Sequence, residues 1–127
     1  MNQIHLQQTP WKLAVCKLET SAIPLWAQGS EFLSYVKTPE EISLVCETHM
    51  VPKGVKAETG WNCMKVHGVL DFSLIGIIAP ITATLAAEKI SVFVIYTYDT
   101  DYLLIKESNT LQATEALKKS GYQFVAA

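Results

Sequence analysis

Two short segments of the sequence carry groups suited to holding a small charged molecule. The first is the loop that leads into a predicted helix, residues 71–76 (DFSLIG), and the second is the turn at residues 97–102 (TYDTDY). Free amides at the start of a helix suit a carboxylate, and carboxylates in a turn suit an ammonium or guanidinium group. If both segments meet at one edge of a sheet, they match the charge pattern of a zwitterionic amino acid.

The acidic turn also has a purely structural interpretation. Asp in a hairpin turn usually hydrogen-bonds its own backbone, and this is the more common role for residues such as Asp99 and Asp101. Tyr98 and Tyr102 are equally compatible with ordinary packing of aromatic strand residues. No nucleophile or base motif accompanies the two carboxylates, which makes them weak candidates for a catalytic pair.

The cysteines and histidines do not form a recognisable site. Cys16, Cys46 and Cys63 are odd in number, lack a C-x-x-C spacing and lie in apolar, strand-like runs, as buried free thiols do. The three histidines fall singly, so we predict no metal site. Since the sequence also has no phosphate loop and no nucleophile elbow, we expect neither enzymatic activity nor a cofactor.

The composition indicates a globular protein with a sizeable core. Half of the 127 residues are hydrophobic, 17% are charged, and the formal net charge is −2. This balance does not favour binding to nucleic acid or to anionic lipid. The longest uncharged stretch, residues 72–87, is shorter than the roughly 18–20 apolar residues that span a bilayer. With no signal peptide visible, we expect a cytoplasmic location.

The second half of the sequence predicts the element order β-α-β-β-α-β. A strand at residues 61–67 is followed by a helix that ends near Lys89. Its apolar residues are predicted to form one buried stripe, made up of Leu74, Ile77, Ile78, Ile81 and Leu85. Residues 91–97 read as a central strand. The chain then turns into a strand at residues 102–106. A second helix is predicted with Asn109 as its cap and Gly121 as its left-handed end. Its inner face would consist of Leu111, Thr114 and Leu117. A final strand follows at residues 122–125.

The first half resembles an incomplete copy of the same unit. It predicts a strand at residues 11–18, one helical turn at 24–27, and a hairpin of strands 32–37 and 42–47 joined by a turn at 38–41. Residues 50–60 read as a linker. The predicted fold is therefore α+β, with two tandem ferredoxin-like (βαββαβ) units, antiparallel sheets and helices on one face. The degenerate first unit covers residues 1–56 and the second covers residues 57–127.

Pro80 is unusual because it lies inside the apparent first helix of the second unit, where proline costs about 3 kcal/mol. One explanation is that the helix starts later, near Ala79, so that Pro80 occupies a tolerated first-turn position. A second hypothesis is that the unwound start exposes backbone groups of Gly76 and Ile77 to a ligand. Both explanations place irregular backbone at this point.

Several motifs resemble one known family. They are ISVFVIYTYDTDYLLI at residues 90–105, TPEEISLV at 38–45, GWNCMKVHG at 60–68 and GIIAP at 76–80. Together they resemble the CASTOR-type ACT domain of arginine sensors and of aspartate kinase regulatory domains. The likeness covers nearly the whole chain in the right order.

The resemblance implies an amino-acid-binding regulatory or sensor protein with its site at an interface between ACT units. It implies that Gly76 and Ile77 hold the amino-acid end of the ligand. Thr97 and Tyr98 would supply contacts from the strand end, Asp101 would take a basic group, and Asp71 would contribute from the loop. Because the larger sensors carry further ACT units, a homodimer would have to complete the pocket.

Two other functions are compatible with the predicted element order. The chain could be a ligand-free ACT dimerisation module that regulates a partner protein. RNA binding shares the βαββαβ order, but the strand YLLIK lacks the basic-aromatic RNA-recognition pattern.

Overall fold

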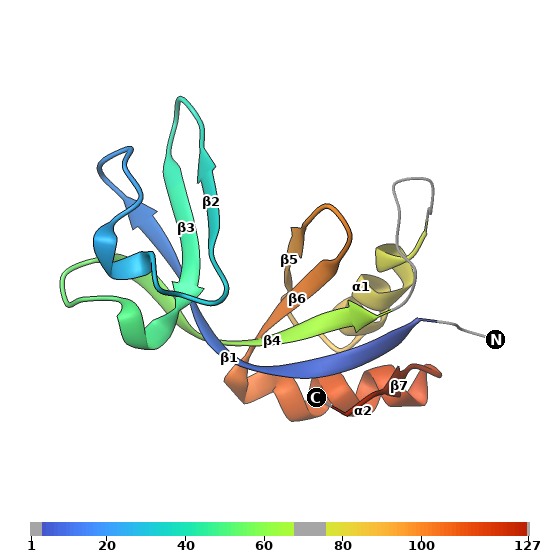
Figure 1. The fold of residues 1–127 in the computed structure, drawn as a ribbon. Coiled ribbons are helices and arrows are strands. Elements are labelled where there is room, and N and C mark those ends of the chain that lie inside the picture. Colours follow the sequence, from blue (N-terminus) through green and yellow to red (C-terminus); the bar gives the residue numbers. More distant parts are fainter. Residues whose placement is uncertain (1–3, 68–75, 127) are drawn as a thin grey trace. The chain divides into compact units, whose positions relative to one another are not determined.

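A computed structural model describes residues 4–67 and 76–126 of the chain. It divides into two compact units, one formed by Met1–Pro10 with Asn62–Ala127 and the other by Trp11–Trp61. Two long strands, β1 (His5–Leu18) and β4 (Lys56–His67), contribute residues to both units (Figure 1). The predicted division at residue 56/57 stays a prediction.

The larger unit has the predicted order β-α-β-β-α-β. Its elements after β4 are α1 (Ile78–Ala87), β5 (Phe93–Tyr96), β6 (Asp101–Lys106), α2 (Glu107–Lys119) and β7 (Gln123–Phe124). The strands lie in the order β1-β4-β6-β5, and β5 and β6 pair as an antiparallel hairpin. This α+β architecture confirms the antiparallel, two-helix part of the predicted fold.

The start of β1 completes this sheet in a way that the sequence did not predict. The expected first strand began at Trp11, but β1 begins at His5, and Leu6 is completely buried in the larger unit. β7 pairs with this segment in parallel, with His5 opposite Gln123 and Leu6 opposite Phe124. The segment was missed because only Leu6 in the polar run HLQQTP is buried.

The expectation that residues 91–97 form a central strand is wrong, because β5 is shorter and ends the strand order of the sheet. Val94 of this strand packs, partly buried, against the hydrophobic core of the larger unit. Phe93 and Tyr96 keep 36% and 64% of their surface exposed. A continuous apolar run therefore marks an edge strand here.

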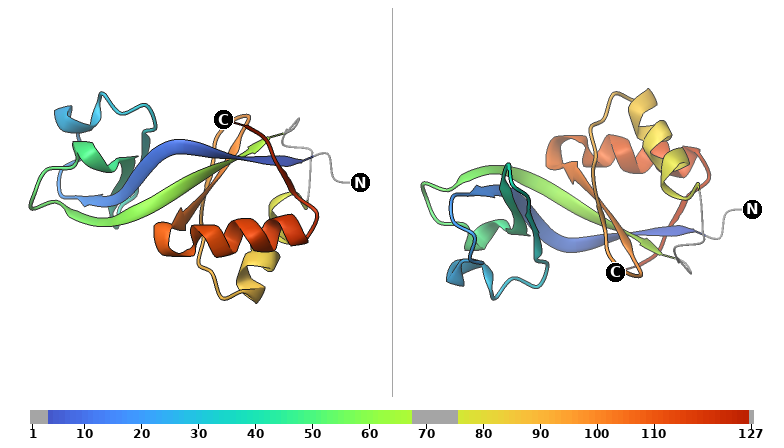
Figure 2. Two further views of the ribbon diagram at one scale, coloured as in Figure 1. Left: turned by 90° about the horizontal axis from the view of Figure 1, so that it is seen from below. Right: turned by 90° about the horizontal axis from the view of Figure 1, so that it is seen from above.

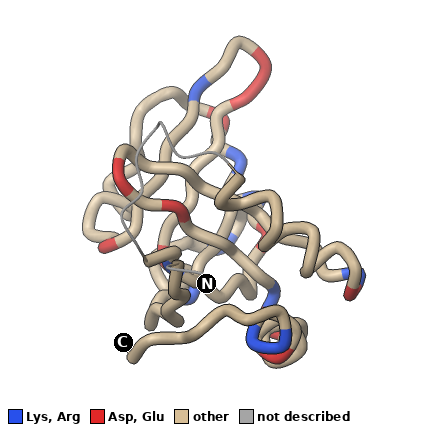
Figure 3. Tube along the Cα trace, turned by 90° about the vertical axis from the view of Figure 1, so that its right-hand side faces the viewer, with Lys and Arg blue, Asp and Glu red and all other residues tan. Residues whose placement is uncertain are grey.

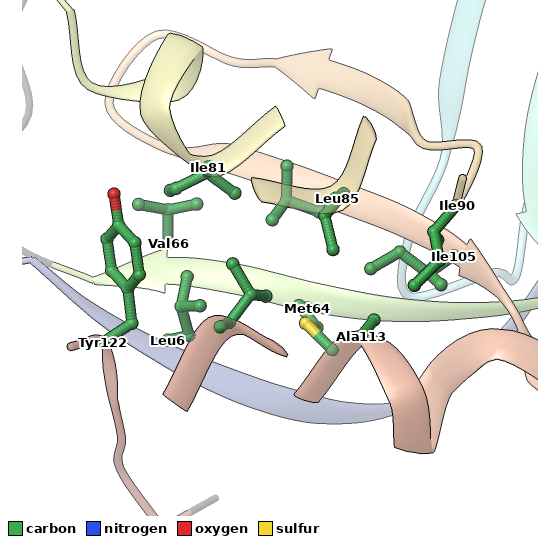
Figure 4. Close-up of a cluster of buried hydrophobic side chains, with 11 residues drawn as sticks. Leu6, Met64, Val66, Ile81, Leu85, Ile90, Ile105, Ala113 and Tyr122 are labelled. Carbon is green, nitrogen blue, oxygen red and sulfur yellow. The ribbon is translucent and has the colours of Figure 1, made fainter. Parts of the chain in front are cut away.

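Both helices of the larger unit lie on one face of its sheet (Figure 2). The core between them combines residues of β1, β4 and β6 with residues of α1 and α2 (Figure 4). Its fully or almost fully buried members are Leu6, Met64, Val66, Ile81, Leu85, Ile90, Leu103, Ile105, Ala113, Leu117 and Tyr122. Burying a side chain of this size contributes roughly 1.5–3 kcal/mol.

Helix α1 begins at Ile78, which settles the position of Pro80. Pro80 is the third residue of the helix, where its missing N–H has no partner to lose. The later start is thus confirmed. The predicted stripe is confirmed at Ile81 and Leu85, which are buried, and at Ile77 and Ile78, which pack partly buried against the core. Leu74, the first residue of this stripe, lies outside the described residues. The helix ends two residues before Lys89, which adopts a left-handed φ of 60°.

Helix α2 differs from its prediction at its start and on one face. It begins at Glu107 rather than after Asn109, so Asn109 lies within its first turn and is not its cap. Leu111 is 73% exposed, whereas Ala113 and Leu117 form the buried face. The spacing of Leu111 and Leu117 is six residues, which places them on different sides of a helix. Gly121 has the predicted left-handed conformation, with φ of 100°.

The smaller unit pairs β2 (Ser34–Lys37), β3 (Ile42–Glu47) and the second half of β1. The predicted hairpin is confirmed, and the Thr38 amide donates to the Glu41 carbonyl across its turn at 2.9 Å. The predicted single turn is the 3₁₀ segment Leu25–Ala27, and a second one spans Thr48–Met50. Ala27, Leu44 and Cys46 form a small buried core.

The predicted linker at residues 50–60 is too long. β4 already begins at Lys56, so the segment from 56 to 60 belongs to a strand. Gly60, which looked like a chain breaker, lies inside β4 with a positive φ of 81°. The polar residues Lys56, Glu58 and Thr59 are exposed, so this part of β4 lacks the hydrophobic alternation that would indicate a strand.

Candidate ligand-binding site

Among the described residues, the start of α1 receives no side-chain cap from its N-cap residue. Gly76 is exposed and has φ of 77°, and Ile77, the N-cap residue, makes no side-chain cap hydrogen bond. The first amides of a helix have no partner within it, and Pro80 has none to offer. The amides of Ile78 and Ala79 therefore mark the positive end of the helix. Asp71, the third predicted contact from this loop, lies outside the described residues.

The turn between β5 and β6 is closed by its own threonines. The Thr97 amide donates to the Thr100 carbonyl at 2.8 Å and the Thr97 hydroxyl donates to the same oxygen at 2.9 Å. The Thr100 amide donates back to the Thr97 hydroxyl at 3.1 Å. The side chain of Thr97 is thus engaged in holding the turn, while Tyr98 keeps 78% of its surface exposed.

Asp101 is the first residue of β6 and points toward the side of the sheet that the helices cover. Side chains alternate along a strand, and Leu103 and Ile105, two and four residues later, are both in the core between sheet and helices. Asp101 is half-buried, and its burial raises the pKa of the carboxyl above its usual value. The turn aspartate Asp99 is exposed. The two acidic residues of the turn therefore lie in different environments.

The start of α1 and the start of β6 lie toward the same end of the core. In Figure 4, Ile81 near the start of α1 lies over Val66, while Leu85 and Ile90 lie toward Ile105. The β6 ribbon runs toward its end near Ile105, so the start of this strand lies toward the Val66 end. Gly76 and Ile77 immediately precede α1 at that end. The roles of these residues in ligand binding stay predictions.

Tyr96 is a candidate contact that the sequence did not single out. It pairs directly with Asp101 across the β5–β6 ladder, so their side chains lie on the same face of the hairpin. Its ring is 64% exposed. Counting residues on either side of the turn pairs Tyr96 with Asp101, and this count is the sequence signal that could have identified Tyr96.

A separate groove lies between the two helices and includes none of the predicted residues. Its volume is about 560 Å³. It is lined by small and polar residues of both helices, including Ala83, Ala87, Gln112, Glu115 and Ala116. Across this region Gln112 donates to Glu88 at 3.3 Å.

Positively and negatively charged positions both occur along the described part of the chain (Figure 3). Figure 3 shows acidic and basic positions interspersed along the described part of the trace. Within residues 4–67 and 76–126 there is no group of three or more His, Cys, Asp or Glu side chains that could hold a metal ion. No helix in these same ranges is long and apolar enough to cross a membrane.

A sheet covered on one face by two helices, in the order β-α-β-β-α-β, is the ferredoxin-like split βαβ arrangement. A family model described as the ACT domain matches residues 56–119, half of the chain. The chain belongs to the ACT domain family. A second family model, which describes an N-terminal domain, matches residues 12–54. No curated protein matches the chain.

Solved structures share this fold over nearly the whole chain. Protein Atu0741 from Agobacterium tumefaciens is 29% identical, with a TM-score of 0.91 over 100% of this chain and 96% of that one. VC0802 from Vibrio cholerae, described as a possible transport protein of unknown function, is 19% identical, with a TM-score of 0.77 over 92% and 89%.

A more distant match is the regulatory subunit of aspartate kinase from Thermus thermophilus. It is 10% identical, with a TM-score of 0.61 over 87% of this chain and 93% of that one. At this identity the likeness shows the fold alone.

Proposed function

We propose that this protein is a cytoplasmic amino-acid-binding regulator or sensor that holds a free amino acid between ACT units. In this proposal the amides at the start of α1 hold the ligand's carboxylate. Asp101 takes the ammonium or a basic side chain, and Thr97 and Tyr98 supply contacts from the turn. Asp71 contributes from the preceding loop. The protein itself performs no chemistry.

The observation that supports the proposal is the opposite polarity of two features of the ACT domain. The uncapped start of α1 is electropositive, and Asp101 is an acidic, half-buried residue whose pKa is raised by burial. A cationic group of a ligand would stabilise the ionised carboxylate that burial disfavours. The family membership makes a small regulatory ligand the natural occupant.

A homodimer would complete the pocket. Thr97 and Tyr98 follow the edge strand β5, and the rings of Tyr96 and Tyr98 are 64% and 78% exposed. Exposed aromatic residues on an edge strand are typical of surfaces that pair with another chain. A second copy at this edge would cover the ligand and bury these rings.

The tandem arrangement belongs to the same proposal. The order strand, 3₁₀ turn, strand, strand in the smaller unit supports a degenerate first ACT unit with a stunted helix. The CASTOR-type signature at residues 90–105 supports arginine or a related amino acid as the first ligand to test.

A thermal-shift screen against the twenty amino acids tests the proposal. A ligand that binds only the folded state raises its stability in proportion to the logarithm of ligand concentration. We expect one or two amino acids to raise the melting temperature, with a larger rise at higher concentration. A flat response to all twenty at millimolar concentration would contradict ligand binding.

The second candidate function is a ligand-free dimerisation module that regulates a partner protein. The closed turn favours it, because the Thr97 hydroxyl is already used within the turn. A flat thermal-shift screen combined with a stable dimer in solution would favour this function.

A further inference from the structure

Two of the three cysteines lie next to each other in the smaller unit, an arrangement that the sequence spacing of thirty residues did not suggest. Strands β1 and β3 pair so that Cys16 faces Leu44 and Cys46 faces Ala14. Cys16 and Cys46 are therefore diagonal neighbours on the same face of the ladder. The two thiols lie close enough for each to influence the pKa of the other.

The pair is shielded from solvent by the small core of this unit. Cys16 is 1% exposed and Cys46 is completely buried. Cys46 packs with Ala27 and Leu44, against partly buried residues such as Trp26 and Val51. Within the described residues no third metal-binding side chain joins the two thiols. The arrangement is thus a dithiol pair.

We propose that Cys16 and Cys46 form a reversible oxidation site, in which a peroxide converts the two thiols to a disulfide that links β1 to β3. One thiolate attacks a peroxide oxygen, which yields a sulfenic acid and releases the other oxygen as water after protonation. The second thiol then attacks the sulfenic sulfur and releases a second water. Two thiols lose two protons and two electrons, and one hydrogen peroxide becomes two waters.

Burial determines how this site reacts. Burial, followed by the neighbouring Cys16, raises the pKa of the Cys46 thiol to about 12, so thiolate is scarce in the closed ladder. Oxidation is expected to be slow and to proceed when β1 and β3 open transiently. The disulfide would therefore form under sustained exposure to peroxide and not under brief exposure.

The geometry also indicates that the disulfide would be easily reduced. Diagonal neighbours in an antiparallel pair have Cα atoms about 7–8 Å apart, whereas most disulfides need about 4.4–6.8 Å. Closure requires the two strands to approach, and a strained disulfide has a higher reduction potential. Thiol reductants should restore the dithiol readily.

Cys63 provides a matched control within the same chain. It is completely buried in the larger unit, and burial raises its pKa to about 12, as for Cys46. Its thiol hydrogen-bonds to Thr9 and has no cysteine contact. It should keep its free thiol while the other two react.

Oxidation of the folded protein with hydrogen peroxide, followed by thiol counting in denaturant and a non-reducing tryptic map, tests the proposal. We expect one of three thiols to remain, a mass loss of two hydrogens, and residues 13–17 linked to residues 38–53. Cys63→Ala should keep this link, and Cys16→Ala should abolish it. Dithiothreitol should restore all three thiols.

Three outcomes would overturn the proposal. The first is a disulfide link from the tryptic peptide 57–65, which contains Cys63. The second is retention of all three thiols. The third is a gain of oxygen atoms in place of a disulfide. Oxidation of the urea-unfolded chain gives the reference for random pairing. If the folded protein gave the same mixture of disulfides as the unfolded chain, the pairing of β1 with β3 would not determine which cysteines are linked. The wild-type map decides the question even if a cysteine variant does not fold.

Discussion

At the residue scale, Asp99 and Asp101 show that the role of an acidic residue in a motif depends on how the strands beside it pair. Both belong to the same acidic turn, and their structural and functional roles could not be separated in the sequence. The strand alternation places Asp101 on the helix side of β6, with Tyr96 as its cross-strand partner. Asp99 is exposed in the turn. Of the two aspartates, Asp101 is therefore the one that we propose as a ligand contact.

Replacing Asp101 with asparagine should remove the ligand-induced rise in melting temperature. The substitution keeps the size of the side chain and removes the charge that a cationic ligand group requires. Asp99→Asn is the matched control, because it removes an equal charge two residues away in the same turn. Equal loss of the thermal shift in both variants would point to a general effect of charge.

The raised pKa of Asp101 predicts how its own stability contribution depends on pH. Because the folded state has the higher pKa, the unfolded state ionises first as pH rises from about 3.8. Ionised Asp101 therefore costs stability above its folded pKa, and this cost disappears at lower pH. Without ligand, Asp101→Asn should melt slightly higher than the wild type at pH 7 and equally at pH 3.5, as measured by circular dichroism.

At the element scale, the sequence predicted the second half well because its elements have strong local signals. The hydrophobic stripe of α1, the left-handed Gly121 and the β-branched run of β5 each identified an element correctly. What could not be predicted depended on contacts distant in the sequence. The polar start of β1 is a strand because β7 pairs with it. β5 is the last strand in the order of the described sheet and pairs with β6 alone among the described strands.

Helix α2 offers a test of its corrected buried face. Leu117 is completely buried whereas Leu111 is 73% exposed. Leu117→Ala should lower the free energy of unfolding by about 2–5 kcal/mol because it leaves a cavity. Leu111→Ala should change it by less than about 0.5 kcal/mol. Urea unfolding of both variants measures the difference, and similar losses would contradict the assigned face.

Pro80 gives the corresponding test for α1. In the first turn a proline costs little, so Pro80→Ala should change stability by less than about 1 kcal/mol. Thr84, four residues later, is inside the helix, and Thr84→Pro should cost about 3 kcal/mol or more. If Pro80→Ala instead strengthened binding of the amino acid found by thermal shift, the unwound helix start would not be what exposes the ligand site.

At the scale of the whole molecule, the proposed site requires a second copy. In the proposed site a partner covers the exposed rings of Tyr96 and Tyr98, so a homodimer of twice 14.1 kDa is expected in solution. Tyr96→Glu should shift the mass measured by analytical ultracentrifugation toward the monomer. Val36→Glu, on the edge strand β2 and 54% exposed, should leave the dimer intact. The reverse pattern would assign self-association to the smaller unit.

The central claim is that one ligand contacts both the start of α1 and the turn before β6. Amide chemical-shift mapping by NMR, with the amino acid that gives the largest thermal shift, tests it most directly. The account predicts the largest changes at residues 76–79 and 97–101. Changes confined to the smaller unit, or to the groove around Ala83, Ala87 and Ala116, would contradict it.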